Sequence, residues 1–334
     1  MLLCALAVVF LSLAVWWMTG MPGRSHSGPL PPLSAEEADL RDRLEGHVRA
    51  LAGRIGERNV FRPAQLAAAA GYLERELVGY GHAVTREDFP TGDLVVRNLI
   101  VERRGSTRPE EIVVVGAHYD SVMGSPGAND NATGVAAVLE IARGLVHREP
   151  GRTVRCAFFV NEEPPFYLGE AMGSLVHARR ARERGERIVA MLSLETIGYY
   201  TDARRSQHYP FPFALFYPST GDFIGFVGNL ASRGLVRRSV ASFRRHAAFP
   251  SEGVAAPGWI PGVGWSDHWS FWEQRYPAVM VTDTALFRYE PYHTSEDTPD
   301  KVGYDHLSRV VAGLVRVVGD LADGQPLAPS TANP

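Results

Sequence analysis

The sequence predicts an α/β fold, a three-layer sandwich whose central sheet is mixed but mostly parallel and lies between two layers of helices. Two observations predict it. Short β-branched segments alternate along the chain with longer segments whose apolar residues recur at helical spacing. In addition, 45% of the 334 residues are hydrophobic, which is enough to bury a parallel sheet on both faces.

The predicted helices follow from capping and periodicity. Ser34 precedes two glutamates and then apolar residues at helical spacing, which is typical of a capped helix over 34–51. Further helices are predicted over 63–80, 135–147, 173–185 and 306–321.

The predicted strands are short, rich in β-branched residues and bounded by Gly, Pro or charged residues. They span 94–102, 111–117, 153–160, 189–194 and 278–283. Their alternation with helices indicates a sheet that is largely parallel and buried.

The segment 199–264 breaks this alternation, because it is rich in Pro, Gly and aromatic residues. We expect this insertion to pack over the ligand face of the sheet, either as a binding element or as a covering loop. The folded domain is then predicted over 34–322, and the tail over 323–334 is expected to be disordered.

The amino terminus is expected to target the chain. Residues 2–18 contain no charged side chain, and a Pro/Gly-rich linker over 21–33 follows. Segment 1–20 is therefore predicted to be an uncleaved signal anchor, with a cleaved signal peptide as the alternative. We expect a single-pass cell-membrane protein whose folded domain is extracytoplasmic, or a secreted or periplasmic one if the segment is cleaved.

Charge and cysteine content narrow the partners. The 34 Lys and Arg residues nearly balance the 37 Asp and Glu residues, without a dense basic block, so no nucleic-acid partner is expected. The two cysteines, Cys4 and Cys156, provide neither a disulfide framework nor a cysteine zinc site. Any metal must be bound by His, Asp and Glu, and the oligomeric state is left open.

Acidic and imidazole side chains follow the predicted strands, where open α/β sheets bind ligands. His118 ends one strand, and Asp120 could accept its second ring proton; an ordinary loop histidine is the alternative. Glu162 and Glu163 end another strand, and adjacent carboxylates in a cleft need a cation or a shared proton unless they are solvated loop acids.

Three more residues complete the set. Asp130 lies in a turn that leads into a helix, where capping is the alternative role. Glu195 ends a strand, and His293 lies in a Tyr-His-Thr sequence. Together, two imidazoles and three carboxylates, with one carboxylate to spare for acid–base work, suit zinc and paired-metal hydrolysis.

The ordered motifs His-x-Asp, Asn-Asp-Asn-Ala-Thr-Gly, Glu-Glu, Leu-Glu-Thr-Ile-Gly, Ser-Asp-His and Tyr-His-Thr occur between residues 98 and 321. This series resembles the co-catalytic zinc family of aminopeptidase Y, glutamate carboxypeptidase and glutaminyl cyclase. The resemblance implies the zinc-peptidase fold, which is phosphorylase/hydrolase-like.

The resemblance also implies roles for individual residues. One zinc ion would be bound by His118 and Glu195, the other by Glu163 and His293, and Asp130 would bridge them. Glu162 would be the general base and Asp120 the partner of His118. A cis peptide bond between Asp130 and Asn131 is implied as well.

Two departures concern the chemistry of the site. Many hydrolytic members have Asp where this chain has Glu195, and some aminopeptidases have an oxyanion-stabilising tyrosine where Val263 stands. His268, Tyr292 or a tyrosine of the insertion would then have to serve as donor. Asp267 and His268 resemble family residues near the site, with a buried structural pair as the alternative.

The resemblance therefore implies an aminopeptidase that binds two zinc ions (Zn²⁺) and acts on a peptide or aminoacyl substrate. The Glu-Glu-Pro-Pro-Phe sequence and the long connection after it are more similar to glutaminyl cyclases, which use one zinc ion. A non-catalytic, receptor-like ectodomain is the third interpretation.

Overall fold

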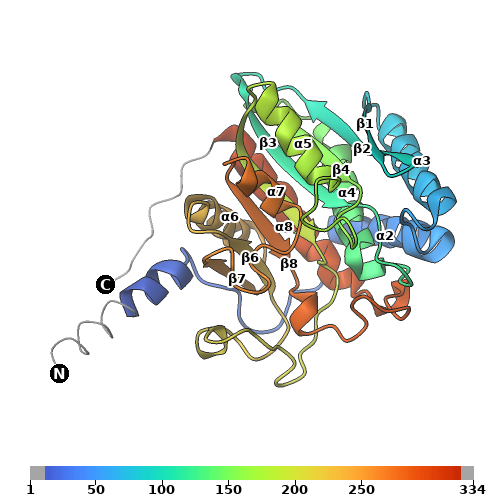
Figure 1. Cartoon of the computed structure of the whole chain (residues 1–334). Coiled ribbons are helices and arrows are strands. Elements are labelled where there is room, and N and C mark those ends of the chain that lie inside the picture. Colours follow the sequence, from blue (N-terminus) through green and yellow to red (C-terminus); the bar gives the residue numbers. More distant parts are fainter. Residues whose placement is uncertain (1–11, 325–334) are drawn as a thin grey trace.

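In the computed structural model, which describes residues 12–324, eight strands form one mixed sheet in the order β1-β2-β4-β3-β5-β8-β6-β7 (Figure 1). The strands are β1 (Thr85–Thr91), β2 (Leu94–Arg103), β3 (Arg108–His118), β4 (Arg152–Phe159), β5 (Arg187–Glu195), β6 (Ile224–Gly228), β7 (Ser251–Ala255) and β8 (Ala278–Thr282). The central strands β4, β3, β5 and β8 are mutually parallel, whereas β2 pairs antiparallel with β4 and β6 pairs antiparallel with β8. The predicted α/β class and mostly parallel sheet are confirmed.

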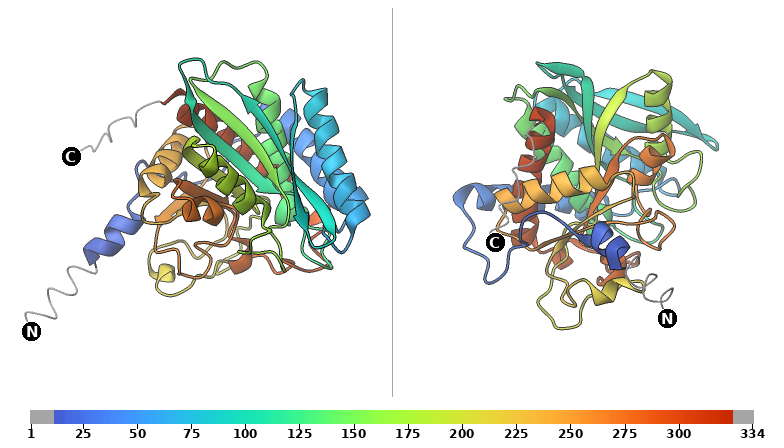
Figure 2. Two further views of the ribbon diagram at one scale, coloured as in Figure 1. Left: turned by 45° about the horizontal axis from the view of Figure 1, so that its top comes forward. Right: turned by 90° about the vertical axis from the view of Figure 1, so that its left-hand side faces the viewer.

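Helices cover both faces of this sheet (Figure 2). The main helices are α2 (Ala35–Val48), α3 (Pro63–Gly79), α4 (Thr133–Leu145), α5 (Gly173–Glu183), α6 (Arg233–His246), α7 (His268–Glu273) and α8 (Tyr304–Asp323). On one face α2, α3, α4, α6 and α8 pack into the larger apolar core, and on the other α5 and α7 pack into a smaller one. The molecule is therefore the three-layer sandwich that the alternation predicted.

Local sequence accounts for the entry into this fold. The Ser34 hydroxyl accepts a hydrogen bond from the Glu37 amide, and the Glu37 side chain accepts one from the Ser34 amide, which completes a capping box. Leu44 and Val48 of this helix are fully buried in the larger core. The helix thus begins where the sequence predicts and is stabilised by the face it buries.

Part of the insertion is regular. The segment predicted to break the alternation contains β6, α6 and β7, which extend the sheet beyond β8 (Figure 1). Both strands have only five residues, and each contains glycine, so periodicity gave no signal for them. Strand β1, an antiparallel edge strand, was not predicted either.

The chain before α2 lies against the domain. Arginine side chains donate to backbone carbonyl groups of this segment, which we name the N-terminal strap (residues 17–31). The donor and acceptor pairs are Arg233 with Trp17, Arg237 with Gly20, Arg244 with Pro22 and Gly23, and Arg309 with Pro31. Met21 packs against the larger core.

The predicted signal anchor lies partly outside the described residues, because residues 1–11 are not among them. Residues 12–19 are helical. Within the described part of the chain, none of the helices has the length and apolar character needed to cross a membrane. Helix α8 ends at Asp323, and most of the predicted tail, residues 325–334, is also outside the described part.

Candidate metal centre

Three neighbouring parallel strands deliver the predicted metal-binding side chains to one edge of the sheet. His118 ends β3, Glu162 and Glu163 follow β4, and Glu195 ends β5. The register aligns His118 with Phe159 of β4, so these side chains emerge at the same level. The carboxyl ends of the strands thus form the crevice in which open α/β sheets bind ligands.

Three fully or almost fully buried residues form the first group, which we name the inner position. Nε2 of His118 lies 3.3 Å from Oδ1 of Asp130 and 3.2 Å from Oε2 of Glu195. The exposed fractions of these residues are only 0%, 3% and 8%. One ligand atom from each lies within 4.8 Å of the others, a spacing that suits a single cation.

The second group, the outer position, shares Asp130 with the first. Nε2 of His293 lies 3.0 Å from Oδ2 of Asp130 and 3.3 Å from Oε2 of Glu163. One carboxylate oxygen of Asp130 therefore faces each group. The His293 side chain is 34% exposed, so this position is open to solvent.

The buried donors fit a metal pair, because the protein alone leaves them unsatisfied. Both ring nitrogens of His118 and Oε1 of Glu163 are buried without a hydrogen-bond partner. Buried polar atoms without partners are costly, so a ligand at this point would stabilise them. Imidazole and carboxylate donors of this kind suit zinc.

The pKa values of the clustered carboxylates also favour a bound cation. Burial and the charges of Asp130 and Glu162 raise the pKa of Glu163 well above its ordinary value. Burial also raises the pKa of Glu195. Burial opposes ionisation of Asp130 too, but the neighbouring imidazoles of His118 and His293 lower its pKa. Crowded carboxylates with raised pKa values are what a cation relieves.

Glu162 lies beside the inner position but belongs to neither group. Its Oε2 is 3.9 Å from Nε2 of His118, and its side chain is buried. Burial raises the pKa of Glu162 well above its ordinary value, which suits a group that takes and returns a proton. Asp120 fixes the backbone that carries Glu162 and Glu163, because its two carboxylate oxygens accept hydrogen bonds from the amides of these residues, each at 3.2 Å. Its Oδ1 also lies 3.6 Å from Nδ1 of His118.

The backbone around the ligands is unusual. The peptide bond between Asp130 and Asn131 is cis, as the resemblance implies. Asn161, Thr196 and His293 have φ values of 62°, 45° and 60°, in the left-handed region that few such residues adopt. Left-handed residues of this kind cluster at functional sites, where surrounding contacts hold them.

Several residues that support the ligands were not predicted. Asp297 accepts hydrogen bonds from the amides of Asn129 and Asp130 at 2.8 and 3.0 Å, and so fixes the bridging loop. The Ser266 hydroxyl donates to Oε2 of Glu195 at 2.8 Å. Ser266 belongs to the Ser-Asp-His motif, so the sequence offered a way to predict its place in the site. Asp297 contacts Asp130 across 167 positions of sequence, and no local pattern predicts that contact.

The predicted supporting residues differ in their surroundings. Both carboxylate oxygens of Asp267 are buried without partners, and burial raises its pKa to about 7. Nε2 of His268 is bonded to the Val263 carbonyl at 2.8 Å, and burial lowers the pKa of this imidazole to about 4. That hydrogen bond engages only Nε2, because Nδ1 of His268 is buried without a hydrogen-bond partner. The Tyr292 ring stacks on the His293 ring, with centroids 3.9 Å apart.

Tyr167 is another residue that the sequence did not single out. It lies in the connection between Glu163 and α5, and its hydroxyl is buried without a hydrogen-bond partner. Burial, followed by the charges of Glu162 and Glu195, raises the pKa of this phenol.

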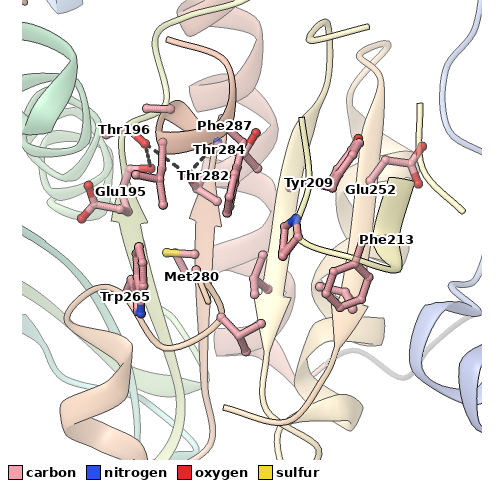
Figure 3. A pocket seen from close by; sticks show the side chains of 18 of the residues that line it. Glu195, Thr196, Tyr209, Phe213, Glu252, Trp265, Met280, Thr282, Thr284 and Phe287 are labelled. Atoms are coloured by element: carbon pink, nitrogen blue, oxygen red, sulfur yellow. Dashed lines mark hydrogen bonds between the residues drawn. The ribbon is translucent and has the colours of Figure 1, made fainter. Parts of the chain in front are cut away.

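An apolar pocket adjoins the metal centre (Figure 3). Its sheet side includes Met280 and Thr282 of β8, and the insertion contributes Tyr209, Phe213 and Val263. Glu195 of the inner position and Tyr292 also line it. Part of the insertion therefore lines the pocket that adjoins the metal centre.

Comparisons with known proteins agree with this geometry. The model of peptidase family M28 matches residues 98–318, which is more than half of the chain. Among relatives, the chain is 36% identical to the uncharacterized protein YfbL of Escherichia coli over 312 residues, which cover 90% of this chain and 91% of YfbL. It is 25% identical to the probable aminopeptidase YDR415C of Saccharomyces cerevisiae over 71% of this chain, but it spans only 61% of that relative.

Solved structures share the fold. The zinc aminopeptidase BSAP from Bacillus subtilis superposes with a TM-score of 0.67 at 16% identity, over 87% of this chain and 97% of that one. The glutaminyl cyclase of Bacteroides thetaiotaomicron gives 0.64 at 18% identity, over 87% and 99%. These likenesses establish the zinc exopeptidase architecture without separating the two activities. The matched family model and the close relative together establish that the chain belongs to peptidase family M28.

Proposed function

We propose that this protein is a zinc-dependent aminopeptidase that removes the amino-terminal residue of peptides. The observation that carries the proposal is the pair of metal positions joined by Asp130, with a free buried carboxylate beside them and an apolar pocket next to them. Paired metals with a separate acid–base group are typical of amide hydrolysis.

Zinc ions bound at the inner and outer positions would polarise the scissile carbonyl group and lower the pKa of water. Glu162 takes the proton from the attacking water and delivers it to the leaving amine. Asp120 keeps Glu162 and Glu163 in place through their amides. The pocket receives the first side chain of the substrate, and its apolar lining favours a large apolar residue there.

The experiment uses the full chain in detergent, loaded with zinc. We expect two zinc ions per chain and release of the first residue from a panel of aminoacyl amides, abolished by chelator and restored by zinc. Glu162→Gln should keep both ions and lose at least about 10²-fold in kcat, the usual contribution of a general base. Unchanged turnover in Glu162→Gln would refute the role of this residue.

A glutaminyl cyclase is the second candidate. The observation that favours it is the long connection between Glu163 and α5, residues 164–172, which resembles that of cyclases. An amino-terminal Gln peptide separates the two, because a cyclase releases ammonia without shortening the chain and an aminopeptidase releases glutamine. A cyclase should also bind one zinc ion instead of two.

A non-catalytic ectodomain is the third candidate, and the complete set of ligands with Glu162 argues against it. A chain without catalytic function has no need to keep partnerless buried polar groups such as Glu163 and His118. Absence of bound metal after zinc loading would favour this candidate.

For localisation, we propose that the charge-free stretch over 2–18 carries the domain out of the cytoplasm and anchors it. Protease added to intact cells should degrade an anchored extracytoplasmic domain, and alkaline extraction should leave the chain in the membrane. If the domain resists added protease even after the outer layer of the cell envelope has been permeabilised, this orientation is contradicted.

A further inference from the structure

Three segments of the described chain combine an uncharged sequence with exposed apolar side chains. They are the amino-terminal helix (12–19), the tip segment of the insertion (206–221) and the return segment (253–266), and none of them contains Asp, Glu, Lys or Arg. Among the described residues, every exposed tryptophan belongs to these segments, and so do several other exposed apolar residues: Leu13, Trp16, Trp17, Phe211, Leu215, Phe216, Trp259 and Trp265. Apolar side chains gathered in this way mark a surface that meets another molecule or a membrane.

The three segments reach the same edge of the sheet, at strand β7. Met21 of the N-terminal strap lies 3.0 Å from the point where a side chain would start on Gly253, and the Tyr217 hydroxyl donates to the Gly253 carbonyl at 2.8 Å. Phe213 and Val263 belong to one apolar cluster, so the tip segment and the return segment pack together. The amino-terminal helix (blue) and the tip segment (yellow) lie on the same side of the molecule in each view (Figure 1, Figure 2).

The side chains at this edge divide into an inward and an outward set. Phe213 is buried, whereas Phe211 and Leu215 on either side of it are 89% and 72% exposed, and Trp259 of the return segment is 83% exposed. Phe213 therefore anchors a loop whose other large side chains face solvent. We name the outward set, Phe211, Leu215, Phe216 and Trp259, the apolar face.

The charged groups where the amino-terminal helix meets the domain are cationic. Arg233 of α6 donates to the Trp17 carbonyl, and its guanidinium lies over the Trp17 ring, 4.4 Å from the centroid. Burial and the charge of Arg237 lower the pKa of Arg233, and no carboxylate of a described residue offsets them. Guanidinium groups without acidic partners beside an apolar surface are complementary to the phosphates of anionic lipids.

The strap leaves no flexible linker between this edge and the charge-free stretch 2–18. Three arginines of α6 bind the backbone carbonyl groups at positions 17, 20, 22 and 23, directly after the amino-terminal helix. Leu13, Trp16 and Trp17 have helical i, i+3 and i+4 spacing, so these exposed side chains share one side of that helix. A stretch that enters a bilayer therefore brings the β7 edge to the bilayer surface, where Trp, Phe and Leu side chains bind well.

We propose that the apolar face inserts into the headgroup region of an anionic bilayer beside the amino-terminal helix, so that the domain lies on the membrane through its β7 edge. The apolar face contributes the buried apolar area, and Arg233 and Arg237 attract the anionic lipid. This inference rests on the proposed localisation and is independent of the proposed aminopeptidase activity. A second copy of this chain is the other occupant that the experiment distinguishes.

The experiment places one spin label on the full chain in nanodiscs of phosphatidylcholine and phosphatidylglycerol. Leu215→Cys reports on the apolar face, and Val95→Cys is the matched control, because Val95 is 67% exposed and lies on β2, near the opposite edge of the sheet. Both variants carry Cys4→Ser, and Cys156 is buried, so each chain has one reactive thiol. We expect the label at 215 to be several-fold more accessible to oxygen than to a water-soluble nickel complex, and the label at 95 to show the reverse.

A second variant removes the apolar face while the label remains. Phe211→Ser with Trp259→Ser, added to the labelled Leu215→Cys chain, should abolish the preference for oxygen, whereas alkaline extraction should still leave the chain in the bilayer. Near-ultraviolet circular dichroism checks that this variant is folded. Nanodiscs of phosphatidylcholine alone should give a smaller oxygen preference than the anionic ones.

Three results would overturn the inference. If the label at 215 is as accessible to nickel as the label at 95 while the chain resists alkaline extraction, the apolar face does not touch the bilayer and the localisation stands. If alkaline extraction removes the chain, the proposed localisation fails and the inference fails with it. Dipolar broadening between labels at 215 that disappears on dilution with unlabelled chain would assign the face to a second copy.

Discussion

The inner and outer positions share one carboxylate but are built from different kinds of structure. His118 and Glu195 sit at the ends of adjacent central strands and are buried, whereas His293 comes from a loop, has a left-handed backbone and is one-third exposed. A ligand on a strand is held by the sheet, and a ligand on a loop can move at lower cost. We therefore expect the inner position to retain its metal ion and the outer position to exchange its ion and admit the substrate.

Replacing Asp130, which the inner and outer positions share, should abolish metal binding at both positions. Asp130→Asn should empty both positions and lower kcat/KM by at least about 10³-fold, which corresponds to ~4 kcal/mol of transition-state stabilisation. Metal analysis and activity measure this, and Asp300→Asn, an exposed residue of the same charge, serves as the control. Two retained zinc ions in Asp130→Asn would show that the two positions do not depend on a common ligand.

Removing one histidine at a time sharpens the comparison. In the metal-free protein, His118→Ala leaves Asp130 and Glu195 buried without their cationic partner and should lower the free energy of unfolding by about 3 kcal/mol. His293→Ala should lower it by less than about 1 kcal/mol, because that side chain is partly solvated. Urea denaturation of both variants measures this, and equal losses would remove the distinction.

Chelation tests the same distinction kinetically. We expect zinc to leave in two phases, with the outer ion released at least several-fold faster, since its histidine lies on a loop that opens locally. Activity should disappear with the first phase, and a chromogenic chelator follows both. A single phase that releases two ions together would indicate one cooperative site.

The smallest expected effect is on pH dependence. In the metal-free protein, the charges of Glu195 and Glu162 raise the pKa of His118 despite its burial, and burial raises that of Glu163. Both folded-state values exceed the unfolded ones, so the bound protons stabilise the fold below the ordinary values of 6.5 and 4.5, and this contribution is lost as pH rises through the folded values.

Zinc must displace these protons, so its affinity should rise with pH, by up to about tenfold per pH unit for each proton released. Calorimetry of zinc uptake in two buffers with different heats of ionisation counts the protons. Uptake without proton release would mean that the ligands are already deprotonated in the metal-free protein.

The sequence was sufficient for the parts of the site that are encoded locally. His118, Glu162, Glu163 and Glu195 could be predicted as site residues because acids and imidazoles follow β-branched segments, and parallel strands bring such ends together. The roles of Asp130 and His293 were implied by the resemblance of their motifs. Asp130 could be predicted as the shared residue because its motif, Asn-Asp-Asn-Ala-Thr-Gly, is contiguous in the sequence. The structure brings His118 and Glu195 into one group and Glu163 and His293 into another, and both groups share Asp130.

The remaining parts depend on contacts between distant segments. Asp297 reaches the Asp130 loop from the far end of the chain, and Tyr167 is distinguished by an absent partner rather than by its neighbours in sequence. The strands β6 and β7 are too short and too rich in glycine for a periodic signal. Only tertiary packing reveals that the insertion both extends the sheet and lines the pocket.

The N-terminal strap moves the boundary of the folded unit. Although the first predicted helix begins after Ser34, the preceding backbone satisfies four arginines of α6 and α8, and Met21 lies 3.0 Å from the point where a side chain would start on Gly253. A chain shortened to Ser34 would return these guanidinium groups to solvent and uncover the core beside β7. We therefore expect the minimal stable unit to begin before Trp17, so that a protease that digests this protein stops ahead of the strap and not at the helix α2 that begins after Ser34.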